Sequence, residues 1–147
     1  MKPIPQVINS LERKYGTCDP FSLAKELGIC IRYEELGTVR GYYHKDLRQK
    51  FILLNRDLTE PQLRFTCAHE LGHALLHPNE NTPFLRKETL FSVSKLEVEA
   101  NRFAVALLMK GIDGANELPI SHIAAQIGVP EEVVSRYIPT VVELSLL

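Results

Sequence analysis

Apolar and polar positions repeat with a helical period at the start of the chain. Apolar residues recur every three to four positions over about residues 5–15, and Gly16 follows as a helix end. Asp19-Pro20 is typical of a helix start, because aspartate caps a helix and proline is favoured at the first helical position. The sequence therefore predicts two short helices, the second ending at Gly28.

The pattern then changes to the two-residue period of strands. Ile29, Ile31 and Tyr33 alternate with polar residues, as do residues 39–43, and residues 51–54 form a short apolar run. Residues 45–49 are predicted to form a hairpin turn. We expect a small twisted sheet of about three strands. One exposed edge strand, near residues 41–44 or 51–55, would be available to bind an extended peptide.

A long helix is predicted after the sheet. Thr59 is suited to cap it, with acidic and proline residues in its first turn, and it should run through His77 and stop at Pro78. Residues 79–94 show no clean period, and a loop of that length is usually functional or mobile. Its part from Thr82 to Ser94 is interpreted either as a substrate-binding flap or as a loop over the sheet.

Helical spacing returns in the last third of the chain. It covers about residues 95–109, and Gly111 and Gly114 end it. Two short helices are predicted at about residues 119–127 and 131–138. Together with the sheet, this order indicates an α+β fold in a single domain over residues 1–147, with a core at about 20–110 and a C-terminal helix pair at about 119–138.

Composition narrows the class of protein. The chain has 147 residues, an apolar fraction of 45%, a charged fraction of 24% and a net charge of −1, as in an ordinary globular domain. This charge balance argues against direct nucleic-acid binding. The three cysteines lack metal-type spacing and fit reduced thiols. With no membrane-length apolar run and no signal-peptide core, a cytoplasmic protein is expected.

The candidate chemistry lies in the long helix, which contains the motif HExxH. His69 and His73 are about one turn apart on one face, so both imidazoles can reach one zinc ion. Glu70 lies beside that position and is suited to act as general base toward a water molecule. Zinc is preferred over manganese or iron because of this ligand set.

The motif leaves a third ligand open. Leu76 and Asn79 occupy the positions where an extended metzincin motif has glycine and histidine, so that class is excluded. His77 lies a further turn along the helix and is interpreted as a helix-end residue interacting with the dipole or as a substrate contact.

The next helix offers two carboxylates. Glu97 and Glu99 are about 200 degrees apart around it, so only one can point at the metal. Glu97 shares a face with Asn101, and this favours Glu97 as a ligand, with Asn101 hydrogen-bonding a ligand. The other reading of these residues is a solvated charged face.

With these residues, the chain resembles the ImmA/IrrE family of metallopeptidases. The resemblance covers roughly residues 20 to 110 and is carried by three blocks of sequence: Arg64 to His73, Glu97 to Ala104 and Leu107 to Met109. It departs from the family at Lys110, where proline is usual.

The resemblance implies a zincin-like fold with zinc held by His69, His73 and Glu97 and with Glu70 as general base. It also implies a phage or mobile-element setting, in which such proteins cleave or inactivate a helix-turn-helix repressor. A residue that stabilises the oxyanion is expected too, and the candidates are Tyr42, Tyr43, His44 and His122.

The sequence allows two functions other than that of a zinc endopeptidase. The first is a metal-stabilised binding module that inactivates a repressor without cleavage. The second is a DNA-binding regulator, since residues 123–137 resemble a helix-turn-helix. Glu131 and Glu132 at the start of the second of these helices would repel phosphates, which disfavours that reading. Cys67 is interpreted as a packed core thiol.

Overall fold

The computed structural model describes residues 3–145, with side chains described for residues 3–138. Six α-helices, three strands and two short 3₁₀ helices succeed one another in this part of the chain. The order is α1 (Ile4–Tyr15), α2 (Pro20–Glu26), β1 (Cys30–Glu34), β2 (Gly41–Asp46), β3 (Gln49–Asn55), α3 (Glu60–Leu76), a 3₁₀ helix (Glu88–Phe91), α4 (Lys95–Lys110), a 3₁₀ helix (Ala115–Glu117), α5 (Ile120–Ile127) and α6 (Glu131–Ser145). The predicted α+β class with a small three-stranded sheet is confirmed.

The helix signals in the sequence act as expected. Gly16 ends α1 in the left-handed conformation at φ 72°. The carboxylate of Asp19 accepts from the backbone N–H of Ser22 at 2.9 Å and so caps α2. Thr59 and Gln62 form a reciprocal capping box at the start of α3. Local chemistry therefore sets where these helices begin and end.

The sheet is mixed, with the strand order β1-β3-β2. β3 lies in the middle, parallel to β1 and antiparallel to β2. The expectation that Phe51 to Asn55 could be an exposed edge is therefore wrong, because the apolar run there is buried between two neighbouring strands. The alternative edge near Gly41 to His44 is correct, since β2 is an outer strand.

The hairpin between β2 and β3 is tighter than predicted. Asp46 pairs directly with Gln49, so only Leu47 and Arg48 form the turn, and the strands include most of the residues assigned to it. Leu47 has a φ of 53°, a value that glycine or asparagine adopts more readily. Because this turn contains neither glycine nor asparagine, the sequence does not indicate a two-residue turn.

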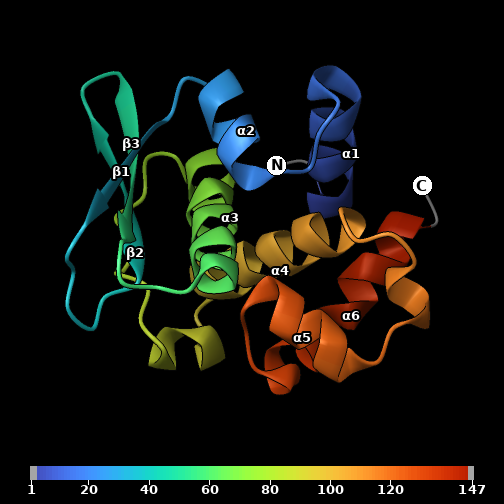
Figure 1. Ribbon diagram of the computed structural model, residues 1–147. Helices are drawn as coiled ribbons and strands as arrows, with labels where there is room; N and C mark the ends of the chain where they lie inside the picture. Colours follow the sequence, from blue (N-terminus) through green and yellow to red (C-terminus); the bar gives the residue numbers. More distant parts are fainter. Residues whose placement is uncertain (1–2, 146–147) are drawn as a thin grey trace.

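The long helix α3 occupies the centre of the molecule. Figure 1 shows the sheet on one side of α3 and α4 on the other; α1 and α6 lie beyond α4, and α5 contacts both α3 and α4. Eleven residues of α3 are buried, including the whole stretch from Phe65 to Ala74. A helix buried on all sides is a rigid support for polar side chains, because any movement would disturb its close packing.

Two glycines allow the close approach that this arrangement needs. A methyl group on Gly72 of α3 would lie 3.1 Å from Cδ1 of Phe103 on α4. A methyl group on Gly41 of β2 would lie 2.6 Å from the carbonyl oxygen of Leu53 and 2.6 Å from Cγ2 of Thr66. Glycine therefore lets α4 and β2 pack closely against α3.

The C-terminal helix pair is present, and α6 is longer than predicted. It continues through Pro139 to Ser145 instead of ending near Ile138. A proline removes one helical hydrogen bond and favours a bend, but the bonds on either side of it can still form. No helix in residues 3–145 combines the length and the apolar character that crossing a bilayer requires.

Candidate metal centre

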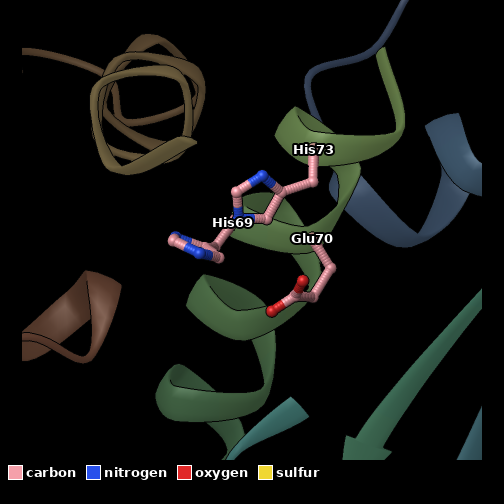
Figure 2. Close-up of side chains that lie close together, drawn as sticks. All are labelled: His69, Glu70 and His73. Atoms are coloured by element: carbon pink, nitrogen blue, oxygen red, sulfur yellow. The ribbon is translucent and has the colours of Figure 1, made fainter. Parts of the chain in front are cut away.

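His69, Glu70 and His73 lie close together on α3, as Figure 2 shows. One potential ligand atom from each of the three lies within 4.8 Å of the others. All three side chains are completely buried. The spacing of the HExxH motif on a helix thus gathers two imidazoles and a carboxylate in one water-poor position.

Glu97 reaches the same position from the first turn of α4. Its Oε1 lies 2.9 Å from Nε2 of His73, and its Oε2 lies 3.2 Å from Nε2 of His69. Glu97 is also buried, with 1% of its surface exposed. The structure therefore brings together the three residues expected to hold the metal, from two helices that pack against each other.

The nitrogen and oxygen atoms of these three side chains are arranged to bind a shared cation rather than to form hydrogen bonds with one another. The Nε2 atoms of His69 and His73 and both carboxylate oxygens of Glu97 are buried and, among the described residues, have no aligned hydrogen-bond partner despite the short distances. Ligands bound at 2.0–2.1 Å in a tetrahedral zinc site are separated by about 3.3 Å. The set of two histidines and one carboxylate is also a known zinc ligand set, so the residues present fit the metal.

The ionisation of the site has clear physical causes. Burial would raise the pKa of Glu97, but the neighbouring His69 and His73 outweigh it and lower this pKa to about 2. Burial lowers the pKa of His73 to about 4, which keeps its imidazole neutral at pH 7. Burial would lower the pKa of His69, but Glu97 and Glu70 outweigh burial and raise it. A carboxylate and a neutral imidazole are the forms that bind a metal ion, so a cation would displace a proton from His69.

Glu70 has the opposite environment. Burial raises the pKa of its carboxyl to about 8, against the lowering effect of His69. Neither carboxylate oxygen has a hydrogen-bond partner among the described residues. A carboxyl group with a pKa near neutrality is suited both to accept and to donate a proton.

Asn101 orients His69. Its Nδ2 donates to the carbonyl oxygen of Leu90 at 3.2 Å, so its Oδ1 faces Nδ1 of His69 at 2.8 Å and can only accept there. A proton of His69 then lies on Nδ1, and its Nε2 faces Glu97. The geometry agrees with the expectation that Asn101 hydrogen-bonds one of the ligands.

His77 and Glu99 form a second contact that the sequence reasoning missed. Nδ1 of His77 lies 3.0 Å from Nδ1 of His73, and Nε2 of His77 lies 3.6 Å from Oε1 of Glu99. The side chain of His77 is buried at the end of the helix. The signal was available, because three histidines at intervals of four residues occupy one face of a helix.

Three of the four oxyanion candidates, Tyr42, Tyr43 and His44, line one cleft, and the fourth, His122, does not. Tyr43 is buried, and its hydroxyl donates to the carbonyl oxygen of Pro78 at 2.8 Å. Tyr42 and His44 line a cleft of about 660 Å³ between β2 and residues 78–84. His122 is exposed on α5 and does not line that cleft. Cys67 is fully buried, in agreement with a core thiol.

Comparison with known proteins places this geometry in a family. The family model described as the IrrE N-terminal-like domain, of peptidase family M78, matches residues 24–138. The chain is 42% identical over 135 residues to the uncharacterized immunity region protein 2 of Bacillus phage phi105, covering 88% of this chain and 85% of that protein. It is 30% identical over 140 residues to metallopeptidase ImmA of Bacillus subtilis strain 168, covering 90% and 82%. With most of its length matched, and with HExxH and Glu97 converging on one point, the chain belongs to the ImmA/IrrE family.

Proposed function

We propose that the protein is a zinc-dependent endopeptidase that hydrolyses a peptide bond in a protein substrate. The observation that carries this proposal is the convergence of His69, His73 and Glu97 within 2.9–3.2 Å, with Glu70 beside them on the same helix. A site that bound zinc only for stability would be expected to offer four protein ligands. Membership of peptidase family M78 and the name of the relative ImmA support a metallopeptidase.

The chain's own residues suggest how the reaction proceeds. His69, His73 and Glu97 would hold the metal, which supplies Lewis-acid polarisation of a carbonyl and a more acidic water. Glu70 takes the proton of the attacking water onto a carboxylate oxygen and then donates it to the leaving amide nitrogen. Burial raises the pKa of this carboxyl, which suits it to donate the proton, and a cation held beside it would lower the pKa again and favour the carboxylate that accepts the proton. Burial also excludes bulk water, which strengthens each electrostatic interaction in the site.

The outer side of β2 supports an extended peptide as substrate. Leu85 forms an isolated bridge to Gly41, with its N–H donating to the Gly41 carbonyl at 2.9 Å and its carbonyl accepting from Arg40. Because backbone groups alternate in an antiparallel ladder, those of Tyr43 and Lys45 face the same outer side as Gly41. They border the cleft between β2 and residues 78–84, where a substrate strand could add.

We infer that the substrate is a helix-turn-helix repressor of a phage or mobile element. The support is the name of the phage relative, which places that protein in an immunity region. Three free cysteines, Cys18, Cys30 and Cys67, fit the reducing cytoplasm in which such a repressor acts.

The alternative is a metal-stabilised binding module that inactivates a repressor without cleavage. One observation favours it: both carboxylate oxygens of Glu70 and Nε2 of both histidines are inaccessible to water. A substrate carbonyl would reach them only after part of the protein moves. The endopeptidase remains the better proposal, because a binding module would have no use for an unpaired carboxylate at Glu70.

The test uses the repressor encoded nearest to the gene. Wild type, Glu70→Gln and the matched control Glu60→Gln, an exposed glutamate of the same helix, are incubated with it, and metal content is measured on all three. Fragments from wild type and Glu60→Gln alone, with zinc in every sample, would support a peptidase with Glu70 as base. Repressor release from DNA without fragments, equal in all three, would support the binding module.

A further inference from the structure

The atoms that would act on a substrate are closed off from water. They are all inaccessible at the surface and comprise Nε2 of His69 and His73 and the carboxylate oxygens of Glu70 and Glu97. The helices that carry them, α3 and α4, are packed into the interior and cannot move apart without disturbing the core. A substrate peptide bond therefore reaches these atoms only after a less firmly packed segment moves aside.

The segment from Phe84 to Phe91, which we call the lid, is attached at its first end to β2. Leu85 is completely buried and forms an isolated bridge with Gly41. Gly41 in turn lies against Thr66, which is one turn before Glu70 on α3. This end of the lid is therefore on the side of the site that β2 borders.

The other end of the lid is attached to α4. The carbonyl oxygen of Leu90 accepts from Nδ2 of Asn101 at 3.2 Å, and Oδ1 of the same amide lies 2.8 Å from Nδ1 of His69. Leu90 is also completely buried. Figure 1 shows the 3₁₀ helix of the lid between the sheet and α4. With one buried leucine at each side, the lid crosses the approach to the site from β2 to α4.

Leu85 occupies part of the strand edge on which a substrate would pair. Its N–H donates to the carbonyl of Gly41 at 2.9 Å, and its carbonyl accepts from the N–H of Arg40 at 2.7 Å. A substrate strand that adds beside Tyr43 and Lys45 would continue along the same edge and meet Leu85 at Gly41. The lid thus holds, with its own backbone, a position that the substrate backbone requires.

The lid is joined internally and exposed on its outer side. The hydroxyl of Thr89 accepts from the backbone N–H of Arg86 at 3.1 Å, and the N–H of Thr89 donates to the carbonyl of Arg86 at 3.1 Å. Phe84 and Phe91 are 45% and 43% exposed, and the residues that flank the lid on both sides belong to no helix or strand. Such a segment can move as one piece while the core stays folded.

We propose that the lid is autoinhibitory: in its closed position Leu85 occupies the edge of β2 in place of the substrate, and Leu90 covers the approach to the metal centre. The inference rests on the proposed function and deepens it, because it names what regulates the same site. A substrate pairs only with molecules whose lid is open. Closure therefore weakens the apparent affinity for the substrate in proportion to the fraction of closed molecules.

A reversible disulfide can hold the lid closed. Tyr42 and Phe84 are opposite each other in the register that Gly41 and Leu85 set, and their rings stack with centroids 4.5 Å apart. Cysteines at directly opposed positions of an antiparallel pair are close enough for a disulfide. The double variant Tyr42→Cys/Phe84→Cys therefore locks the lid when it is oxidised and releases it when it is reduced.

The locked and released forms are compared on the repressor encoded nearest to the gene. The zinc-loaded double variant is oxidised, freed of oxidant and assayed before and after reduction, with wild type treated in the same way. Both forms lack the same two aromatic rings, so only the disulfide differs. We expect reduction to raise the rate of cleavage at least about 10-fold in the variant and to leave wild type unchanged. Equal cleavage by the locked and released forms would overturn the inference alone.

Leu90→Ala tests the opposite direction. Loss of this buried side chain should favour the open lid and lower the KM for the repressor about 10-fold, with kcat less affected. Val93→Ala, at a position that is 82% exposed just beyond the lid, is the matched control and should behave as wild type. An unchanged or raised KM in Leu90→Ala would contradict autoinhibition.

Amide hydrogen exchange follows the lid without any catalysis. In wild type, the N–H of Leu85 should be at least about 10-fold less protected than that of Ile52 in the central strand, because lid opening does not require global unfolding. Equal protection of the two amides would show that the lid opens only when the whole protein unfolds, and the inference would fall. Absence of cleavage by zinc-loaded wild type and by every variant, despite a mobile Leu85, would instead overturn the proposed function and the inference with it.

Discussion

Oδ1 of Asn101 on α4 lies 2.8 Å from Nδ1 of His69 on α3. The same amide donates to the carbonyl of Leu90, so the segment between α3 and α4 is connected to a proposed metal ligand through one side chain. The orientation of His69 therefore depends on the packing of two helices and a loop.

Replacement of Asn101 tests this dependence. Asn101→Ala should weaken zinc binding about 10- to 100-fold, because His69 loses the acceptor that fixes its tautomer. Asn101→Asp retains an oxygen acceptor and should lose less. Chelator competition measures both, with Asn116→Ala, at an exposed position, as the control. Equal affinities in all three variants would show that Asn101 serves only the loop.

Removal of the metal should destabilise the protein, because the ion would join α3 to α4. Chelation should lower the melting temperature of the wild type, and it should have no effect on His73→Ala or Glu97→Ala, which we expect to lack the ion already. Glu99→Ala should still bind zinc and respond to chelation. Calorimetry with and without chelator, together with metal analysis, makes the comparison. Stoichiometric zinc in His73→Ala would rule out the proposed site.

The glycines that allow close packing should not tolerate alanine. Gly41→Ala would place a methyl group 2.6 Å from a backbone carbonyl, which cannot move without shifting β3. We expect a loss of about 1–3 kcal/mol in the free energy of unfolding, typical of overpacking. Gly72→Ala meets only the side chain of Phe103, at 3.1 Å, and should lose less. Urea denaturation orders the two variants, and the reverse order would contradict the packing argument.

Asp19 should stabilise the protein in a pH-dependent way. Burial would raise its pKa, but Ser22 and the guanidinium of Arg64, 2.6 Å away, outweigh burial and lower it. A lowered pKa in the folded state means that the stabilisation is present above the unfolded pKa of about 3.9 and is lost as pH falls through the folded value.

Asp19→Ala tests this contribution. It should cost about 1 kcal/mol at pH 7, as expected for a lost helix cap, and nothing below the folded pKa. Denaturant unfolding of wild type and variant from pH 7 to pH 3 gives the difference at each pH. A constant difference across this range would contradict the linkage.

Much of this protein follows from local sequence. Thr59 and Gln62 begin α3, Asp19 begins α2 and Gly16 ends α1, because caps and left-handed turns depend on a few neighbouring residues. The placement of His69, Glu70 and His73 within one turn of each other also follows from helix geometry alone. Helix geometry also places Glu97 on the same face as Asn101, which favours Glu97 over Glu99 as the third metal ligand.

Tertiary structure decided what local patterns leave open. The strand order placed β3 rather than β2 in the centre, because a short apolar run does not say which strands will flank it. Whether Glu97 on α4 meets two histidines on α3 depends on the approach of two helices at Gly72 and Phe103. The contact of Glu99 with His77 has the same origin. Residues far apart in the chain meet only when close packing selects one arrangement of the helices, and that selection involves the whole core at once.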